Sequence, residues 1–409
     1  MNALVTDGDE RPALAITRSL GRRGIDVIVG EARAASLASS SRYCREHVQY
    51  PSPYDEPEAF ARFLCDLVQR RRIDVVLPVT DVTTHAVAAY RERLARHTSC
   101  AVPSLGAFEL AADKGWLAAA AAASGISVPR TEIVADASAL PGVLPRLTYP
   151  VVVKPARSRI RTAGGWIRAS VAHVGDEQTL RRLFRDSPHL QRHPTLIQER
   201  VIGPGTGVFL LCDRGRVLTA FAHRRLREKP PSGGASVLSE SIAVDPALRA
   251  QAERLLAPLG WHGVAMLEYK RDRDSGRAYL MEMNGRFWGS LQLAVDAGVD
   301  FPYLAWQLAR ARIGALPAVY RIGVRSRWLL GDLDHLFLRM FRDDPALPAG
   351  APPRCRAALA FLVGGSGARN EVLRPDDVRP GLHEMGRYAA AVVQSLLART
   401  RRSHGHFHD

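Results

Sequence analysis

The feature that most constrains the fold is an alternating pattern in residues 264–286, VAMLEYKRDRDSGRAYLMEMNGR, where two strand-like runs flank a polar turn at 271–277. Successive side chains of a strand point to opposite faces of its sheet, so odd and even positions form two separate sets. The odd positions are all apolar or aromatic: Ala265, Leu267, Tyr269, Tyr279, Met281 and Met283. If this set is buried, a hairpin register centred on Ser275 places Glu268 directly opposite Glu282.

Three polar residues on the even face of this hairpin form a candidate metal site. Directly opposed Cβ atoms lie about 5 Å apart, so Glu268 and Glu282 repel one another unless a cation joins them. Asn284 extends the same face by one pleat. Oxygen ligands without His or Cys suit Mg²⁺ or Mn²⁺ rather than zinc, and magnesium usually completes its shell with phosphate and water. The pattern therefore predicts a divalent cation and implies a nucleotide, the alternative being a solvent-facing sheet surface.

The remaining sequence predicts an α/β region followed by an α+β region. In residues 1–105, short apolar runs alternate with helical segments, which favours a parallel, Rossmann-like sheet. The turn at 6–10, TDGDE, lacks the GxGxxG spacing of dinucleotide-binding domains, which argues against a nicotinamide cofactor. From about residue 128, strand-like runs joined by short turns predict antiparallel hairpins. We expect a frayed, basic tail at 399–409.

The cations of the chain are unusual in kind. The net charge is +15, yet only four of the 56 basic residues are lysines: Lys114, Lys154, Lys229 and Lys270. Where arginine is the default, a lysine marks a site that favours a compact ammonium over a planar fork. Because the arginines are spread along the chain, the charge favours only non-specific association, and a dedicated nucleic-acid function is the weaker alternative.

The sequence also indicates a compartment. The five cysteines are scattered without a CxxC pair, which argues against a disulfide framework or a zinc site. No run approaches the roughly 18 apolar residues of a membrane helix, and the first residues lack the apolar segment of a signal peptide. We therefore expect a cytoplasmic protein without a membrane span.

The run 280–286, LMEMNGR, resembles the metal-binding strand of the ATP-grasp superfamily, which includes biotin carboxylase, carbamoyl-phosphate synthetase and D-alanine–D-alanine ligase. The resemblance covers about residues 1–310, through five short motifs in the order that the superfamily uses. It implies a Rossmann-like pre-ATP-grasp domain at 1–105 and a two-lobed ATP-grasp domain, with a first lobe at 106–195 and a second lobe at 196–310. Residues 311–409 resemble only the variable C-terminal regions of such enzymes.

Four of these motifs imply nucleotide contacts. Lys114 and Lys154 resemble the two nucleotide lysines of the superfamily, and Gly164 and Gly165 occupy the place of the glycine-rich flap that closes over the phosphates. The run 196–203, LIQERVIG, resembles the interlobe hinge. It implies that the adenine edge is read by Glu199, Arg200, Val201 and Ile202. The carboxylate that often binds the ribose has no clear counterpart, so the ribose contact is unassigned.

A basic loop at 223–236, HRRLREKPPSGGAS, resembles a loop of carboxylate–amine ligase-like members. Arginine forks pair bidentately with carboxylates and phosphates, so the resemblance implies catalytic roles for Arg225 and Lys229. Arg286 shares the face of Asn284 and is expected at the γ-phosphate or the substrate carboxylate. The alternative for the loop is a solvated basic segment.

Together, the motifs resemble those of an ATP- and Mg²⁺-dependent ligase, for which Mn²⁺ is a substitute metal. Such an enzyme activates a carboxylate as an acyl phosphate and joins it to an amine, releasing ADP and phosphate. The alternatives are a carbamoyl-phosphate-synthetase-like phosphorylation of a small carboxylate and a non-catalytic nucleotide-binding protein. We expect small-molecule acid and amine substrates and no specific nucleic acid. The number of metal ions and the formation of a homodimer stay open.

Overall fold

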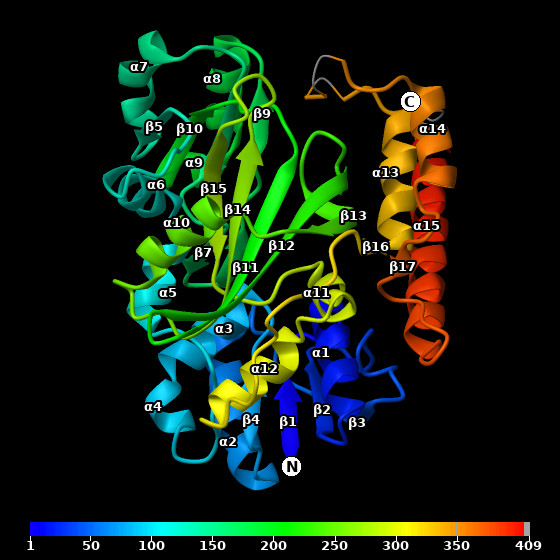
Figure 1. The fold of residues 1–409 in the computed structure, drawn as a ribbon. Helices are drawn as coiled ribbons and strands as arrows, with labels where there is room; N and C mark the ends of the chain where they lie inside the picture. The colour runs from blue at the N-terminus through cyan, green and yellow to red at the C-terminus, as the bar shows by residue number, and fades with distance from the viewer. Residues whose placement is uncertain (345, 348–349, 405–409) are drawn as a thin grey trace.

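The computed structural model describes residues 1–344, 346–347 and 350–404. Figure 1 shows an N-terminal domain (blue) below a large sheet (green), a first lobe (teal) above it, and C-terminal helices (orange to red) along one side. Over the described residues, no helix is both long enough and apolar enough to cross a membrane.

The N-terminal domain is a parallel sheet with helices, as the alternating pattern predicts. Its four strands are hydrogen-bonded in the order β3-β2-β1-β4, and all three pairings are parallel. Its elements are β1 (Asn2–Val5), α1 (Arg11–Gly21), β2 (Asp26–Glu31), β3 (Cys44–Gln49), α2 (Pro57–Arg71), β4 (Val75–Leu77), α3 (Asp81–Ala89) and α4 (Arg91–Leu94). A Cβ at Gly8 would lie 2.4 Å from the Ser36 hydroxyl oxygen, so the protein's own side chains fill the turn after β1.

The first lobe has a small antiparallel sheet of order β5-β10-β6-β9 and a separate hairpin, β7–β8. Two helices lead into it, α5 (Leu105–Ala112) and α6 (Lys114–Ala123). Its other elements are β5 (Thr131–Val134), α7 (Leu140–Val143), β6 (Val151–Pro155), β7 (Arg159–Thr162), β8 (Gly165–Arg168), β9 (Ala172–Val174), α8 (Glu177–Asp186), α9 (Pro188–Arg192) and β10 (Thr195–Glu199). This lobe has its own hydrophobic core, which is separate from the core that joins the other parts.

The second lobe contributes five strands to a seven-stranded sheet of order β15-β14-β11-β12-β13-β16-β17. Its elements are β11 (Gly205–Asp213), β12 (Arg216–Lys229), β13 (Ala235–Ile242), α10 (Pro246–Leu256), β14 (Gly263–Arg271), β15 (Ala278–Asn284), α11 (Leu291–Ala297) and α12 (Phe301–Ala309). Helices α11 and α12 pack against α1, and one continuous core therefore joins this lobe to the N-terminal domain.

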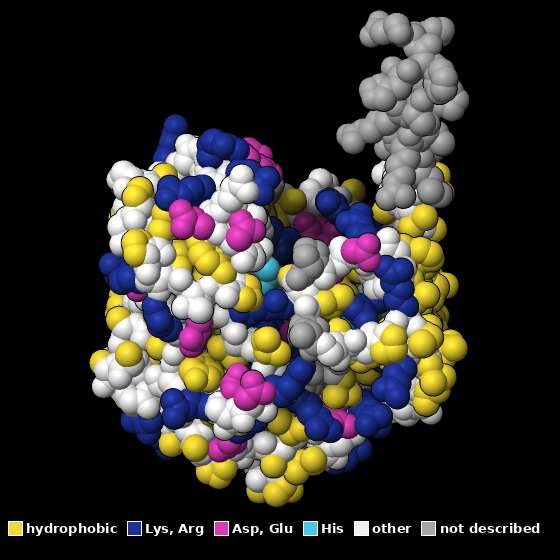
Figure 2. Space-filling view, turned by 90° about the horizontal axis from the view of Figure 1, so that it is seen from above, with side chains coloured by type: hydrophobic (Ala, Val, Ile, Leu, Met, Phe, Trp, Pro, Cys, Tyr) yellow, Lys and Arg dark blue, Asp and Glu magenta, His cyan; other side chains and the backbone are white. Residues whose placement is uncertain are grey.

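The C-terminal region completes the same sheet. It comprises β16 (Arg325–Arg327), α13 (Leu329–Phe341), α14 (Arg354–Val363), β17 (Arg369–Asn370) and α15 (Arg379–His404). Helix α15 continues into the segment that we expected to be a frayed tail, whereas residues 405–409 lie outside the described part. Seen from above, apolar side chains gather along one edge of the molecule, over these helices (Figure 2). Phe341 of α13 and Leu362 of α14 are more than 70% exposed.

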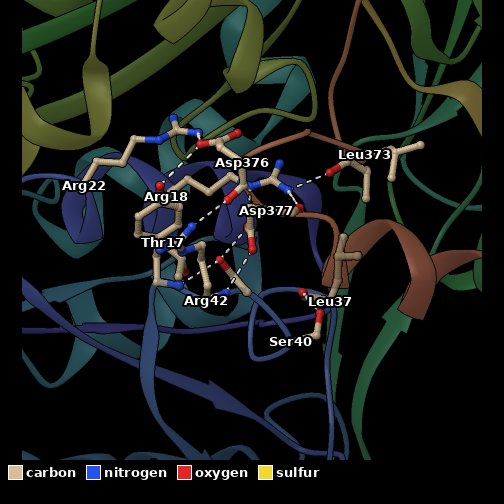
Figure 3. Close-up of polar contacts among 12 residues, drawn as sticks. Thr17, Arg18, Arg22, Leu37, Ser40, Arg42, Leu373, Asp376 and Asp377 are labelled. Atoms are coloured by element: carbon tan, nitrogen blue, oxygen red, sulfur yellow. Dashed lines mark hydrogen bonds and ion pairs between the residues drawn. The ribbon is translucent and has the colours of Figure 1, made fainter.

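A buried polar clamp fixes the segment 371–377 of this region to α1 (Figure 3). The Arg18 guanidinium, 1% exposed, donates hydrogen bonds to the Asp377 carboxylate and to backbone carbonyl oxygens at 371, 372 and 377. Asp377 also accepts from the Ser41 hydroxyl and from the Arg42 N–H group. The clamp makes the C-terminal region an integral part of the fold, which the sequence did not predict.

Candidate active site

A cavity of about 750 Å³ lies where the N-terminal domain, the two lobes and the loop 230–236 meet. Its lining includes eleven of the fourteen predicted site residues: Lys114, Lys154, Glu199, Arg200, Val201, Arg225, Lys229, Glu268, Glu282, Asn284 and Arg286. Residues separated by 172 positions in the sequence thus reach one space, and the cavity is the candidate active site.

The hairpin of β14 and β15 has the predicted register at this cavity. Glu268 lies opposite Glu282, and Met266 lies opposite Asn284. Leu267, which is fully buried, and Met283, 6% exposed, face the core as expected. The prediction that both carboxylates share one face is confirmed.

Beyond the site the register shifts by one residue, because a bulge separates Glu268 from Tyr269. Tyr269 pairs with Leu280, so Leu280 is buried and Met281 lines the cavity. The expectation that Met281 packs in the core is therefore wrong. The physical reason lies at the outer edge of β15, where the Leu280 N–H group donates to the Ser127 carbonyl oxygen.

Arg225 bridges the sheet to reach Glu268. Its guanidinium donates from both terminal nitrogens to the two Glu268 carboxylate oxygens, one of them at 2.7 Å, and also to Glu228 at 2.9 Å. Burial raises the pKa of Glu268 above its ordinary value, and Arg225 opposes that rise. In this structure a side-chain cation therefore neutralises one of the two predicted metal-binding carboxylates.

A glycine of β11, Gly205, makes room for that bridge. Strand β11 lies between β12 and β14, and Gly207 pairs with His223 on one side and Glu268 on the other. A Cβ at Gly205 would lie 3.0 Å from Arg225 Cδ. Because Gly205 has no side chain, Arg225 crosses β11 on the cavity face, whereas a Cβ at Gly207 would meet Phe209 and His223.

The two predicted nucleotide lysines lie beside Glu282. Helix α6 begins at Lys114, and the Asp113 side chain caps it by accepting from the N–H groups of residues 115 and 116. Lys114 Nζ donates to the Ser158 hydroxyl at 2.7 Å and lies 3.9 Å from a Glu282 oxygen. Burial lowers the pKa of Lys154 to about 8, although Glu282 opposes that shift. The cavity wall thus holds two amines close to the carboxylate pair.

Burial alone would raise the pKa of Glu282, but Lys114, Asn284, Lys154 and Arg286 together hold it below its ordinary value. The Asn284 amide donates to Glu282 at 3.1 Å, and its oxygen accepts from Arg286 at 3.0 Å. Glu282 is therefore a carboxylate at neutral pH. Within the described residues, no three His, Cys, Asp or Glu side chains are grouped in a way that could hold a metal. The predicted set is of a different kind, because its third member is the amide of Asn284.

Lys229, at the end of β12, is held by the C-terminal region. It forms an ion pair with Asp334 of α13, and its Nζ lies 5.3 Å from the centre of the Trp328 ring. Arg11, which also lines the cavity, lies over the same ring at 4.1 Å and pairs with Glu371. The C-terminal region, which was predicted to be variable, therefore holds two cations of the cavity in place, Lys229 and Arg11.

Three residues that were predicted to contact the nucleotide do not line the cavity. A Cβ at Gly165 would lie 2.2 Å from the Tyr54 carbonyl oxygen, so the flap hairpin docks on the N-terminal domain, and Gly164 also lies off the cavity wall. The Ile202 carbonyl oxygen accepts from the Arg273 N–H group at 2.8 Å. The cavity therefore gives no support to nucleotide contacts by Gly164, Gly165 or Ile202.

The structure adds residues that sequence reasoning missed. Lys270 lines the cavity, so all four lysines of the chain do. Its position on the even face, two residues after Glu268, and the scarcity of lysine were the available signals. His223 and Trp288 also line the cavity. In the sequence, His223 stood out only as the first residue of the basic loop 223–236, and no pattern singled out Trp288.

Comparison with known proteins agrees with this geometry. Residues 191–329 match the family described as ATP-grasp in the biosynthetic pathway with Ter operon. Those residues include the segment 196–203, Arg225 and the whole hairpin of β14 and β15. The protein has an ATP-grasp fold. No curated protein matches the chain by sequence.

Solved structures show the same ATP-grasp fold at low sequence identity. The L-amino acid ligase from Bacillus licheniformis is 19% identical with a TM-score of 0.57, covering 75% of this chain and 73% of that one. A biotin carboxylase–ATP-analogue complex from Campylobacter jejuni is 16% identical with a TM-score of 0.62, covering 79% and 74%. The N5-carboxyaminoimidazole synthetase from Staphylococcus aureus is 14% identical with a TM-score of 0.61, covering 84% and 86%. At these identities the likeness establishes the fold alone.

Proposed function

We propose that the protein is an ATP- and Mg²⁺-dependent ligase that activates a carboxylate as an acyl phosphate and joins it to an amine. The observation that carries this proposal is the meeting, in one cavity, of the opposed carboxylates Glu268 and Glu282 with Lys114, Lys154 and Arg286. Two amines and a guanidinium beside a carboxylate pair suit a triphosphate and its metal ion.

The donor set fits a hard divalent cation. Glu268, Glu282 and the Asn284 amide oxygen provide oxygen ligands on facing strands. Binding of the ion would replace Arg225 at Glu268 and Lys114 near Glu282, since both cations now neutralise these carboxylates. When bound, Mg²⁺ would supply positive charge to the phosphate oxygens as the phosphoryl group is transferred.

The chain's own residues would then position and stabilise the reactants. Phosphoryl transfer places charge on oxygens, so catalysis is mainly positioning and electrostatic stabilisation. Lys154 and Arg286 would stabilise the transferred phosphoryl group, and Arg225 and Lys229 would hold the acyl phosphate or the substrate carboxylate. The docked flap hairpin would exclude water from that reactive intermediate.

The test is a screen of acid–amine pairs that measures ADP release together with product mass. We expect ADP and an amide product in equal amounts for the correct pair. Glu282→Gln should abolish both, whereas Glu253→Gln, in an exposed ion pair on α10, should change neither. An unchanged rate in Glu282→Gln would contradict the metal assignment.

The same screen separates the alternatives. A phosphorylated small carboxylate without an amide indicates carbamoyl-phosphate-synthetase-like chemistry, and nucleotide binding without any ADP indicates a non-catalytic protein. We propose a cytoplasmic setting, which the five free cysteines support. The homodimer stays an open prediction, and a molar mass from light scattering would decide it.

A further inference from the structure

Three buried side-chain nitrogens, from residues that line the cavity, have no hydrogen-bond partner among the described residues. They are His223 Nε2, Arg225 Nε and Trp288 Nε1. All three residues line the cavity, and they are 1%, 10% and 2% exposed respectively. Buried polar groups are nearly always paired, so three such groups on one cavity wall indicate a missing partner.

These groups lie close together. His223 and Arg225 are two residues apart on β12 and share its cavity face. The rings of His223 and Trp288 both pack against Phe209, with centroid distances of 4.7 and 4.2 Å. Ser290, also on the cavity wall, lies 3.3 Å from His223 Nδ1. We name His223, Arg225, Trp288 and Ser290 the donor subsite.

The chemistry of the donor subsite selects an oxygen acceptor. The N–H groups of Trp288 and Arg225 can only donate. Burial, with a smaller effect of Arg225, lowers the pKa of His223 well below its ordinary value, so its ring is neutral. When the Ser290 hydroxyl donates to Nδ1, Nε2 carries the hydrogen and becomes a third donor.

The charge of the cavity matches that of a metal-bound nucleotide. Eleven arginine and lysine side chains line it, against six aspartate and glutamate side chains. Three of these cations pair with carboxylates outside the lining: Lys229 with Asp334, Arg11 with Glu371 and Arg157 with Asp113. A nucleotide triphosphate with one Mg²⁺ carries about two negative charges, so the cavity is close to neutral once the nucleotide is bound.

A second set of unpartnered nitrogens lines the cavity from the first lobe. Arg159, Trp166 and His173 each carry a buried ring or guanidinium nitrogen without a partner among the described residues, and all three come from the first lobe. The donor subsite instead belongs to the second lobe, on the wall shared with Arg286. The two sets of nitrogens therefore belong to different lobes.

We propose that the donor subsite binds a second oxygen-bearing group of the acid substrate, so that the substrate class is small acids with a second carboxylate or a carboxamide. The carboxylate to be activated would then point towards Arg286 and Glu282. This inference rests on the proposed ligase function and adds the class of acid to it.

The test measures binding of matched acids by calorimetry, with and without Mg²⁺ and a non-hydrolysable ATP analogue. The panel is succinate, glutarate and succinamate, each compared with the monocarboxylic acid of the same carbon number. We expect at least one diacid or acid amide to bind ten- to a hundredfold more tightly than its monoacid partner. Trp288→Phe, which removes the indole N–H group, and His223→Leu should each abolish most of that preference without changing monoacid binding.

Trp306→Phe is the matched control. Trp306 in α12 is 7% exposed and its indole nitrogen also lacks a partner among the described residues, but it does not line the cavity. Trp306→Phe should keep the full preference for the diacid or acid amide over the monoacid. His223→Gln should keep it as well, because the glutamine amide retains an N–H donor. Circular dichroism checks the fold of each variant, and the wild-type panel is informative without any variant.

Equal binding of diacids and monoacids to the wild type would overturn the proposal. So would an equal loss of preference in Trp306→Phe and Trp288→Phe. The ATP-analogue titration keeps the two claims apart. If the analogue binds and no acid preference exists, the inference alone fails. If the analogue does not bind while the preference and its loss in Trp288→Phe persist, the ligase proposal fails and the donor subsite stands.

Discussion

Replacing Arg18 by methionine should release the C-terminal region from the N-terminal domain. Arg18 donates to Asp377 at 2.8 Å and to three backbone carbonyl oxygens at 2.9, 2.6 and 3.1 Å (Figure 3). Methionine fills similar space but donates nothing. Asp377 would keep only the Ser41 hydroxyl and the Arg42 N–H group as donors, so a buried carboxylate would lose its charged partner.

Breaking a buried ion pair by removing one partner typically costs about 3–5 kcal/mol. Hydrogen exchange followed by mass spectrometry measures this loss locally, which is preferable to a single unfolding free energy for a multidomain chain. Amides of 371–377 and of the first turns of α15 should exchange about a hundredfold to several thousandfold faster in Arg18→Met, since each 1.4 kcal/mol is a factor of ten.

The matched control is Arg22→Met. Arg22 pairs with Asp376 in the same loop, but the two side chains are 35% and 45% exposed, and exposed pairs contribute at most about 1 kcal/mol. In Arg22→Met, exchange of the same amides should therefore change by less than about tenfold. Equal exchange rates in the Arg18 and Arg22 variants would show that the buried clamp does not hold the region.

Three further predictions concern other parts of the chain. Burial raises the pKa of Asp7 from 3.8 to about 6, so the stability that its protonated form provides is complete below about pH 4 and is lost as the pH rises through 6. The loss is on the order of 3 kcal/mol, and Asp7→Asn should remove this slope from melting temperatures measured between pH 4 and 8. Arg225→Gln should tighten Mn²⁺ binding without nucleotide by about tenfold in calorimetry, because it frees Glu268 from its ion pair. Weaker binding would contradict the idea that Arg225 and the metal ion compete for Glu268. Gly165→Ala, at φ +110° and against the Tyr54 carbonyl oxygen, should undock the flap at a cost of about 1–3 kcal/mol, visible as faster proteolysis of β7–β8.

The sequence predicted most of the site because the site is built on regular strands. Alternation alone required Glu268 and Glu282 to share a face, and the structure confirms that register. It could not predict the bulge after Glu268, because that bulge depends on a contact of Leu280 with residue 127, far away in the chain.

The partners of the site residues were beyond sequence patterns for a different reason. Arg225 reaches Glu268 across an intervening strand at Gly205, so the contact depends on the order of strands in the sheet and not on spacing along the chain. Lys229 is likewise fixed by Asp334, 105 residues later. Such contacts follow from topology, which local periodicity does not determine.

The placement of all four lysines on one cavity has a practical consequence. A reagent that acylates primary amines has no lysine target elsewhere on this chain, so, apart from the N-terminal amine, the mass that it adds reports the occupancy of a single site. Lys114, Lys154, Lys229 and Lys270 come from four different elements, α6, β6, β12 and β14, and peptide mapping would resolve which of them a ligand shields. The chain therefore carries its own footprinting labels, and unknown ligands can be located without introducing a probe residue.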